Sequence, residues 1–196
     1  MMSVRRLLAA GAVALALTPI AAQAVPKIVP LPVAASYPRG TIIIVNADRK
    51  LYYVLGDGRA IQYPVAVGKP EELWVGRTFV SEKKENPKWT PDDDREPVEG
   101  GEPGNPLGKR ALYLDWSLLR IHGTPSRGSI GSSASAGCIR MFDEDVIDLY
   151  ERVHIGAPVV AIDDMSEVRR FLQPKVTGKV DTDGPSTPGK RRREDD

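Results

Sequence analysis

Runs of β-branched and apolar residues separated by turn residues are the feature that most constrains the fold of this 196-residue chain. Such residues favour strands, and runs of this length bounded by Gly, Asn and Asp predict strands joined by turns. The three clearest runs are Thr41–Val45, Leu51–Leu55 and Ala60–Val67. Asn46-Ala47-Asp48 separates the first two, and Gly56-Asp57-Gly58 predicts a hairpin between the last two. A sheet is therefore expected here.

The remainder of the central region continues the β pattern with little helix. Further strands are expected over Leu73–Ser81, Arg110–Asp115, Leu118–His122 and Val159–Ile162. The chain holds 18 Gly and 17 Pro, and only 6% of its residues are aromatic, which favours a loop-rich β or mixed domain over a helical bundle. We therefore predict a mostly β fold (β-rich mixed α/β) with one or two short helices.

Two short helices are expected near the end of this region. Asp143 is a suitable cap for a helix over Glu144–Val153, and Ser166 for a short helix that ends at Leu172. The apolar residues Val146, Ile147, Tyr150 and Val153 fall on one face of the first helix. That face is expected to pack on the sheet.

A long segment without periodicity, Glu85–Gly108, contains five prolines and four glycines and many acidic residues. Loops of this length inside a compact domain are usually functional, often as lids. We therefore expect a functional loop here.

The first residues have the composition of an export signal. Arg5 and Arg6 precede an apolar run over Leu7–Ile20, and Ala22-Gln23-Ala24 provides a small-x-small cleavage site. The run is shorter than the roughly 20 apolar residues that a membrane span needs. We expect residues 1–24 to be a signal peptide, which leaves an exported, periplasmic protein without a stable membrane anchor.

The remaining boundaries follow from composition. Residues 25–40 are proline-rich and are expected to be a linker, and the β-rich residues 41–165 the folded domain. Residues 166–176 are assigned to the short C-terminal helix. Residues 177–196 are rich in Gly, Pro and charge without apolar periodicity, which predicts a disordered tail.

Charge and cysteine content exclude several classes of function. The formal charge of +1 becomes −1 once Arg5 and Arg6 are removed, so the balance argues against nucleic-acid binding by bulk electrostatics. A single cysteine cannot form an internal disulfide. With only two histidines it also cannot complete a Cys/His zinc cage, so no metal site is predicted.

The chemistry is expected in the segment Arg120–Met141. Cys138 is a lone thiol in a chain bound for an oxidising compartment, where an unused exposed thiol is a liability. Small residues precede it, so the backbone N–H groups of Gly137 and Cys138 are candidates for an oxyanion hole. His122 ends an apolar strand and is followed by Gly123, which makes it the candidate base for the thiol. A buried inert thiol and a structural core histidine are the alternatives from residue types alone.

The same stretch resembles the L,D-transpeptidase family with its YkuD-type catalytic domain. The matching motifs are His122-Gly123-Thr124, Ile130-Gly131, Ser135-x-Gly137-Cys138 and Ile139-Arg140. Three outer segments are similar to family segments that precede the core motif: Tyr63–Gly68, Pro87–Pro91 and Asn105–Gly108. The resemblance covers roughly Thr41 to Ile162 and implies the β-sandwich of that catalytic domain.

The resemblance also implies a reaction, with no cofactor. Cys138 would attack the carbonyl of the third residue of a peptidoglycan tetrapeptide stem, release D-Ala, and pass the acyl group to an amine as a 3→3 crosslink. His122 would move the proton, and the carbonyl of Gly123 would orient its ring. Such an enzyme serves cell-wall biogenesis and cell shape.

Three further residues have expected substrate contacts. Arg140 is a candidate for binding a substrate carboxylate, or else for a salt bridge with Asp143 or Asp145. Ser135 is a candidate substrate-binding residue, and Trp89 in the long loop is a candidate for packing on the stem or the sugar.

One position departs from the family pattern. The family has Ser-His-Gly-Cys where this chain has Ser135-Ala136-Gly137-Cys138, so proton transfer would depend on His122 alone. Water, a free D-amino acid or a lysine of a wall-anchored protein are alternative acceptors. Two other classes stay open: a peptidoglycan cysteine hydrolase or carboxypeptidase with the same residues, and a non-catalytic wall-binding domain.

Overall fold

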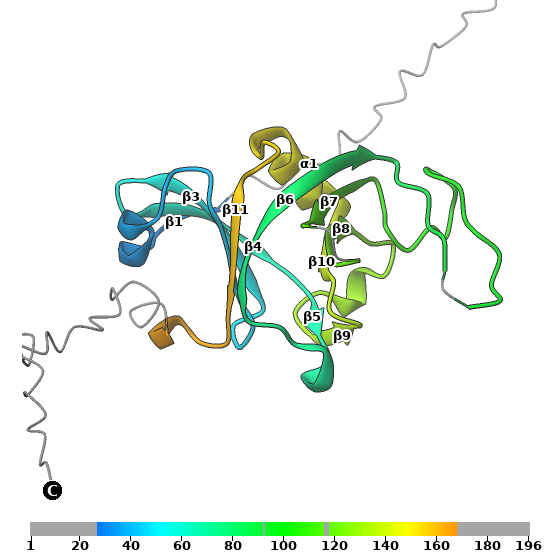
Figure 1. Ribbon diagram of the computed structural model, residues 1–196, viewed down its shortest axis with the longest axis horizontal. Helices are drawn as coiled ribbons and strands as arrows, with labels where there is room; N and C mark the ends of the chain where they lie inside the picture. The colour runs from blue at the N-terminus through cyan, green and yellow to red at the C-terminus, as the bar shows by residue number, and fades with distance from the viewer. Residues whose placement is uncertain (1–26, 92, 116–117, 168–196) are drawn as a thin grey trace, which may run out of the picture.

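The computed structural model describes residues 27–91, 93–115 and 118–167 (Figure 1). Its strands are β1 (Lys27–Pro30), β2 (Ile42–Val45), β3 (Lys50–Gly56), β4 (Arg59–Pro64), β5 (Val67–Gly68), β6 (Gly76–Glu85), β7 (Arg110–Leu114), β8 (Arg120–Gly123), β9 (Ser133–Ser135), β10 (Ile139–Met141) and β11 (Pro158–Ile162). The helix is α1 (Asp143–Arg152), and short 3₁₀ turns are η1 (Pro32–Ser36), η2 (Pro70–Glu72), η3 (Arg127–Ser129) and η4 (Met165–Glu167). The signal peptide expected over 1–24, the tail over 177–196 and most of the helix expected over 166–176 lie outside the described residues.

Within that described part, nine strands form one continuous sheet in the order β1-β4-β3-β2-β11-β6-β7-β8-β10. The ten-residue strand β6 joins the two halves of this sheet, because its first half pairs with β11 and its second half with β7. The register shifts between Val80 and Glu82, so the sheet changes direction there. Figure 1 shows β1, β3 and β11 on one side of β6 and β7, β8 and β10 on the other. The predicted mostly β fold is confirmed.

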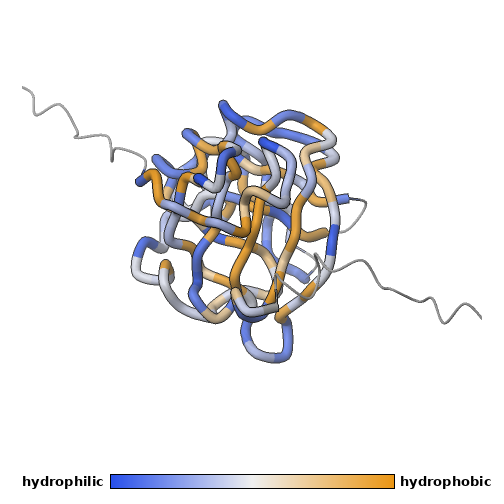
Figure 2. Tube along the Cα trace, turned by 90° about the vertical axis from the view of Figure 1, so that its left-hand side faces the viewer, coloured by the Kyte–Doolittle hydropathy of each residue, from blue (hydrophilic) through white to orange (hydrophobic). Residues whose placement is uncertain are grey.

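The larger of the two hydrophobic cores in the described residues lies between the two halves of the sheet and α1. It includes Ile42 and Tyr63 from one half, Leu112 and Ile121 from the other, and Leu149 from the helix, each at most 2% exposed. Burial of each such side chain stabilises the fold by roughly 1.5–3 kcal/mol. Apolar segments accordingly run through the interior and polar ones lie at the rim (Figure 2).

Helix α1 is also tied to the sheet by tyrosine hydroxyls. Tyr63 donates to Asp148 at 2.5 Å, and Tyr53 donates to the carbonyl of Arg152 at 3.0 Å. The expected cap is wrong in detail. Phe142 is the capping residue and makes no side-chain cap bond, while the Asp143 carboxylate accepts from the N–H of Lys109 at 3.1 Å.

The proline-rich segment expected to be a linker is largely part of the domain. Strand β1 pairs antiparallel with β4, and Leu31 and Ala34 pack against the second face of the sheet, on residues such as Val54. β1 is an edge strand, where proline is tolerated because one side needs no hydrogen-bond partner. Composition therefore indicated neither the turn η1 nor the packing of this segment on the sheet.

The third expected strand is shorter than its apolar run. β4 ends at Pro64, which has no N–H to donate, and the chain then changes partner. Ala66 exchanges two hydrogen bonds of 2.9 Å with Arg140, and Val67 pairs with Ser133. The strand expected over Leu73–Ser81 starts later, at Gly76, and extends to Glu85.

No helix in the described ranges is both long and apolar enough to cross a membrane.

Candidate active site

Two neighbouring parallel strands at one end of the sheet bring the candidate base and the candidate thiol together. β8 and β10 pair in parallel, with Arg140 opposite His122 and Ile139 opposite Ile121. Cys138 immediately precedes β10, which places it level with Arg120 on β8. Opposite residues of a parallel pair, and alternate residues of one strand, project to the same face. His122, Arg140 and Arg120 therefore share a face beside Cys138.

His122 is 4% exposed and is held by its neighbour. Its Nδ1 lies 2.6 Å from the carbonyl oxygen of Gly123. A carbonyl only accepts hydrogen bonds, so Nδ1 carries the proton and Nε2 has a free lone pair. The pKa of His122 is lowered from 6.5 to about 4, mainly by burial; the Gly123 bond opposes this shift, and the charges of Arg140 and Arg120 contribute to it. The ring is therefore neutral at pH 7.

Position 123 requires glycine because there is no space for a side chain. A Cβ there would collide with the Asp143 carboxylate and lie 3.2 Å from the backbone nitrogen of Lys109. The approach of these three segments fixes the carbonyl on which His122 depends.

Cys138 is partly exposed, and its Sγ lies 3.8 Å from the carbonyl oxygen of Leu118. Three hydrogen bonds hold the turn that presents it. The Ser135 hydroxyl donates to the carbonyl of Cys138 at 2.5 Å, the Trp74 indole donates to the carbonyl of Gly137 at 3.1 Å, and the N–H of Lys69 donates to the carbonyl of Ser135 at 2.9 Å. The turn of residues 135–138, called the nucleophile turn after its candidate nucleophile Cys138, is thus braced from the segment that follows β5.

Gly137 adopts φ +97°, a conformation that other residues rarely reach. A Cβ would also lie 3.0 Å from the Leu119 side chain. Within the described residues, the N–H groups of Gly137 and Cys138 have no hydrogen-bond partner. Two donors are therefore available next to the thiol.

One cavity of about 490 Å³ contains both His122 and Cys138. Its other lining residues are Trp89, Arg95, Gly104, Pro106, Leu107, Arg120, Ser135, Ala136 and Arg140. Every candidate side chain named from the sequence lines it. Gly137 and Gly123 contribute through backbone groups.

Arg140 does not form either of the salt bridges that were its alternative. In the described part of the chain its guanidinium has no ion pair with Asp143, Asp145 or any other acid. It is partly exposed in the cavity and is free to bind an anion.

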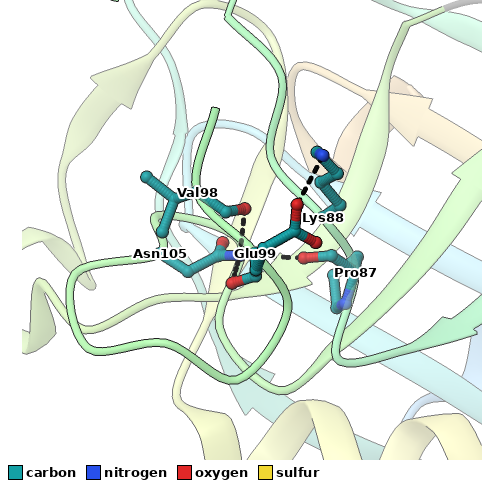
Figure 3. A network of polar contacts seen from close by, with 5 residues as sticks. All are labelled: Pro87, Lys88, Val98, Glu99 and Asn105. Atoms are coloured by element: carbon teal, nitrogen blue, oxygen red, sulfur yellow. Dashed lines mark hydrogen bonds and ion pairs between the residues drawn. The ribbon is translucent and has the colours of Figure 1, made fainter. Parts of the chain in front are cut away.

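The long loop forms one wall of the cavity, and a buried asparagine organises it (Figure 3). The Asn105 amide, 3% exposed, donates to the carbonyls of Pro87 at 2.9 Å and Glu99 at 3.0 Å, and its oxygen accepts from the N–H of Leu107 at 2.8 Å. Trp89 and Val98 exchange two backbone bonds of 2.9 Å. The loop is therefore built around a fixed frame that holds Trp89 at the cavity.

Sequence reasoning missed three contributors to the site. Trp74 and Asn105 act through hydrogen bonds to distant carbonyls, which no local pattern reveals. Arg120 lies two residues before His122, and strand alternation placed it on the same face, so this residue could have been found from the sequence.

The arrangement is suited to acyl transfer. A neutral imidazole with a free Nε2 can accept the proton of a thiol in the same cavity, and the thiolate is the nucleophilic form. Free N–H groups beside the sulfur can stabilise an oxyanion, and arginines can bind carboxylates.

Comparison with known proteins agrees with a site suited to acyl transfer. The family model described as the L,D-transpeptidase catalytic domain (YkuD) matches residues 40–160. The chain is 35% identical over 129 residues to a Bacillus subtilis protein described as "Putative L,D-transpeptidase YqjB", covering 63% of this chain and 71% of that protein. It is 36% identical over 138 residues to the "Probable L,D-transpeptidase ErfK/SrfK" of Escherichia coli, covering 62% of this chain and 44% of that protein. The alignment thus spans less than half of the second relative.

The fold is also similar to solved structures. L,D-transpeptidase 3 from Mycobacterium tuberculosis matches with a TM-score of 0.54 at 20% identity, over 64% of this chain and 62% of that one. At this identity the likeness extends to the fold.

Proposed function

The chain belongs to the L,D-transpeptidase (YkuD) catalytic-domain family, and from this premise we propose that it is a cysteine acyltransferase that acts on peptidoglycan stem peptides. One observation carries the proposal. Cys138 and the buried, neutral His122 line the same cavity, and His122 has its Nε2 lone pair free. A hydrolase with these residues remains the contrasting outcome of the test below.

In the acylation step, the thiol proton of Cys138 passes to Nε2 of His122. The sulfur attacks the carbonyl of the third stem residue, and a carbon–sulfur bond forms. The amide bond to the terminal D-Ala then breaks, and its nitrogen leaves as an amine with the proton that His122 held. The Gly123 carbonyl supports the transient imidazolium, because it accepts from Nδ1 in both protonation states.

The oxyanion formed in this step is assigned to the N–H groups of Gly137 and Cys138. Both are free of other partners in the described part of the chain, and the positive φ of Gly137 sets their direction. A preorganised donor of this kind contributes roughly 3–4 kcal/mol to transition-state stabilisation in other enzymes.

Substrate contacts are assigned to Arg140 and Trp89. Arg140 lines the cavity without an ion pair to any described residue, and its guanidinium can bind a carboxylate bidentately. Trp89 presents an aromatic surface from the loop wall. Ser135 is reassigned: it lines the cavity, but its hydroxyl is engaged with the Cys138 carbonyl, so we propose that it positions the nucleophile turn.

In the second step an amine resolves the thioester. The side-chain amine of a neighbouring stem gives a 3→3 crosslink, and a lysine of a wall protein gives anchoring. Water would give carboxypeptidase activity, and a free D-amino acid would give exchange. The partly exposed sulfur leaves room for an acceptor to approach.

The compartment follows from the same proposal. The substrate polymer lies outside the cytoplasmic membrane, and Arg5, Arg6 and the apolar run Leu7–Ile20 have the pattern of a cleaved signal. We propose that the mature protein begins after Ala24 and acts in the periplasm.

The test is product analysis by mass spectrometry after incubation with purified disaccharide tetrapeptides. The transferase gives crosslinked dimers and free D-Ala, and Cys138→Ala gives neither. Formation of tripeptide alone, with amine acceptor present, indicates the hydrolase. No reaction with either protein contradicts the proposal.

A further inference from the structure

The cavity is lined by more positively charged side chains than the proposed acyl transfer requires. Three arginines line it, Arg95, Arg120 and Arg140, and no aspartate or glutamate is among its lining residues. Arg95 pairs with Asp93 through a bidentate contact of 2.7–2.9 Å. The other two have no ion pair in the described part of the chain. Two arginines without an ion pair among the described residues therefore line the cavity that contains the thiol.

The Arg120 side chain packs in a defined position, although it has no ion pair with an acidic residue in the described part of the chain. Its guanidinium lies 5.3 Å from the ring centroid of Tyr113, the residue opposite it on β7. Its Nε is buried and has no hydrogen-bond partner among residues 27–91, 93–115 and 118–167. A buried donor without a partner destabilises the fold, so an arginine left in this state is suited to a ligand that completes its bonds.

Arg120 and Arg140 lie on the neighbouring strands β8 and β10, next to His122 and Cys138. Arg140 lies opposite His122 in the β8–β10 ladder, and Arg120 lies level with Cys138. Adjacent strands are about 4.8 Å apart, and alternate residues of one strand about 6.6 Å. The backbone positions of Arg120 and Arg140 thus lie diagonally across those of His122 and Cys138, and both arginines line the cavity that contains the sulfur.

We propose that Arg120 is a specificity-determining residue that acts with Arg140 as a two-carboxylate site, so that the protein selects acyl donors with free carboxylates on both residues of the amide that is broken. This rests on the proposed function. In such a donor one carboxylate belongs to the leaving residue, and the other to the side chain of the diamino acid that is attacked.

Amidation is the chemical change that this site should detect. A primary amide has nearly the shape of a carboxylate but no charge, and it presents N–H donors to arginine donors. Hydrogen bonds to charged groups are stronger than neutral ones by an amount that corresponds to about 5- to 10-fold in affinity. Each amidation should therefore weaken binding by about that factor.

The experiment measures binding to Cys138→Ala by calorimetry, so that no thioester forms. Four tetrapeptide donors are compared: both carboxylates free, each one amidated singly, and both amidated. Arg120→Gln is expected to remove the penalty of one amidation, and Arg140→Gln that of the other. Arg120→Lys retains the charge and should restore part of the preference. Arg59→Gln, an exposed arginine on β4, is the control and should leave all four affinities unchanged.

Two results overturn the inference. One is equal affinity of Cys138→Ala for all four donors. The other is an Arg120→Gln protein that loses affinity for every donor to the same extent, which is the effect of a structural role. Acylation of the unmutated thiol by the free donor is followed in parallel. Its absence, with the binding preference intact, contradicts the proposed function and leaves the carboxylate site standing.

Discussion

At the scale of single residues, the site is a thiol and a base whose surroundings set their properties. His122 is neutral because it is buried and because two arginines lie near it, and it keeps one tautomer because Gly123 accepts from Nδ1. Ala136 is exposed, so a histidine there would have no comparable environment. One buried histidine is therefore expected to perform all proton transfer.

His122→Ala is expected to slow acylation of Cys138 by about 10²–10⁴-fold, the usual range for a positioned proton-transfer group. Adduct formation with a carbapenem, followed by intact-protein mass, measures the rate. Cys138→Ser should give no adduct, since a serine hydroxyl is poorly ionised beside a lone imidazole. Adding Ala136→His should not rescue His122→Ala, and recovery of the original rate would assign the proton to position 136.

The pH dependence of acylation is expected to reflect the low pKa of His122. Protonated imidazole cannot accept the thiol proton, so the second-order rate should fall only as the pH drops through about 4, and not near 6.5. The rate constant measured well below saturation reports the free protein. An acid limb centred near 6.5 would show that the histidine is not buried as described.

Trp74→Phe tests the brace of the nucleophile turn. Phenylalanine keeps the aromatic packing but loses the donor to the Gly137 carbonyl, a bond worth about 1 kcal/mol. We expect acylation to slow by roughly 5–10-fold with little change in thermal stability. Leu73→Ala, at an exposed neighbouring position, serves as the control and should retain the full rate. A large loss of stability in Trp74→Phe would indicate that the ring is needed mainly for packing.

At the scale of elements, the long loop has a structure of its own without helix or further strand. Its frame is the Asn105 amide, which joins the start of the loop at Pro87 to its end at Leu107. The ion pair of Lys88 with Glu99 lies outside this frame, at half-exposed side chains. The buried amide is therefore expected to matter far more than the ion pair.

Asn105→Ala should lower the unfolding free energy by about 2–3 kcal/mol, because it leaves buried backbone groups unpaired. It should also speed proteolytic cleavage within residues 87–104, which limited proteolysis and mass analysis detect. Lys88→Ala is the matched comparison and should cost less than about 1 kcal/mol. Equal effects of the two substitutions would show that the asparagine is not the organising residue.

At the scale of the whole molecule, the sheet has two covered faces. One face and α1 enclose the main core, and Leu31 and Ala34 cover part of the other. The site sits at the β8–β10 end, far along the strand order from β1. Stability and chemistry are thus expected to separate when the N-terminal segment is changed.

A protein that begins at Tyr37 should be less stable than one that begins at Lys27 by about 3 kcal/mol or more. The loss exposes apolar residues of the sheet such as Val54 and removes the β1–β4 pairing. Denaturant unfolding measures the difference. Removal of residues 177–196, which show no apolar periodicity in the sequence, is the comparison and should leave folding and acyl transfer nearly unchanged. If the protein that begins at Tyr37 had the same denaturation midpoint as the one that begins at Lys27, the proline-rich segment would be a linker, as its composition predicted.

The local sequence pattern determined most of the secondary structure and the family of this protein. The cores of β2, β3, β7, β11 and α1 lie where β-branched runs or helical periodicity predicted them. The motif from His122 to Cys138 also indicated the family, because residue types and spacing together are specific. These features depend on neighbours within a few positions, which the sequence displays directly.

Only the tertiary structure decided how distant segments meet. Strand β11 lies parallel to β2 although more than a hundred residues separate them, and β10 lies beside β8. The Trp74 bond to Gly137, the Asn105 frame and the packing of Leu31 depend on those meetings. Burial and hydrogen-bond partners are properties of the assembled chain, so a residue such as Arg120 shows its unpaired charge only once its neighbours are in place.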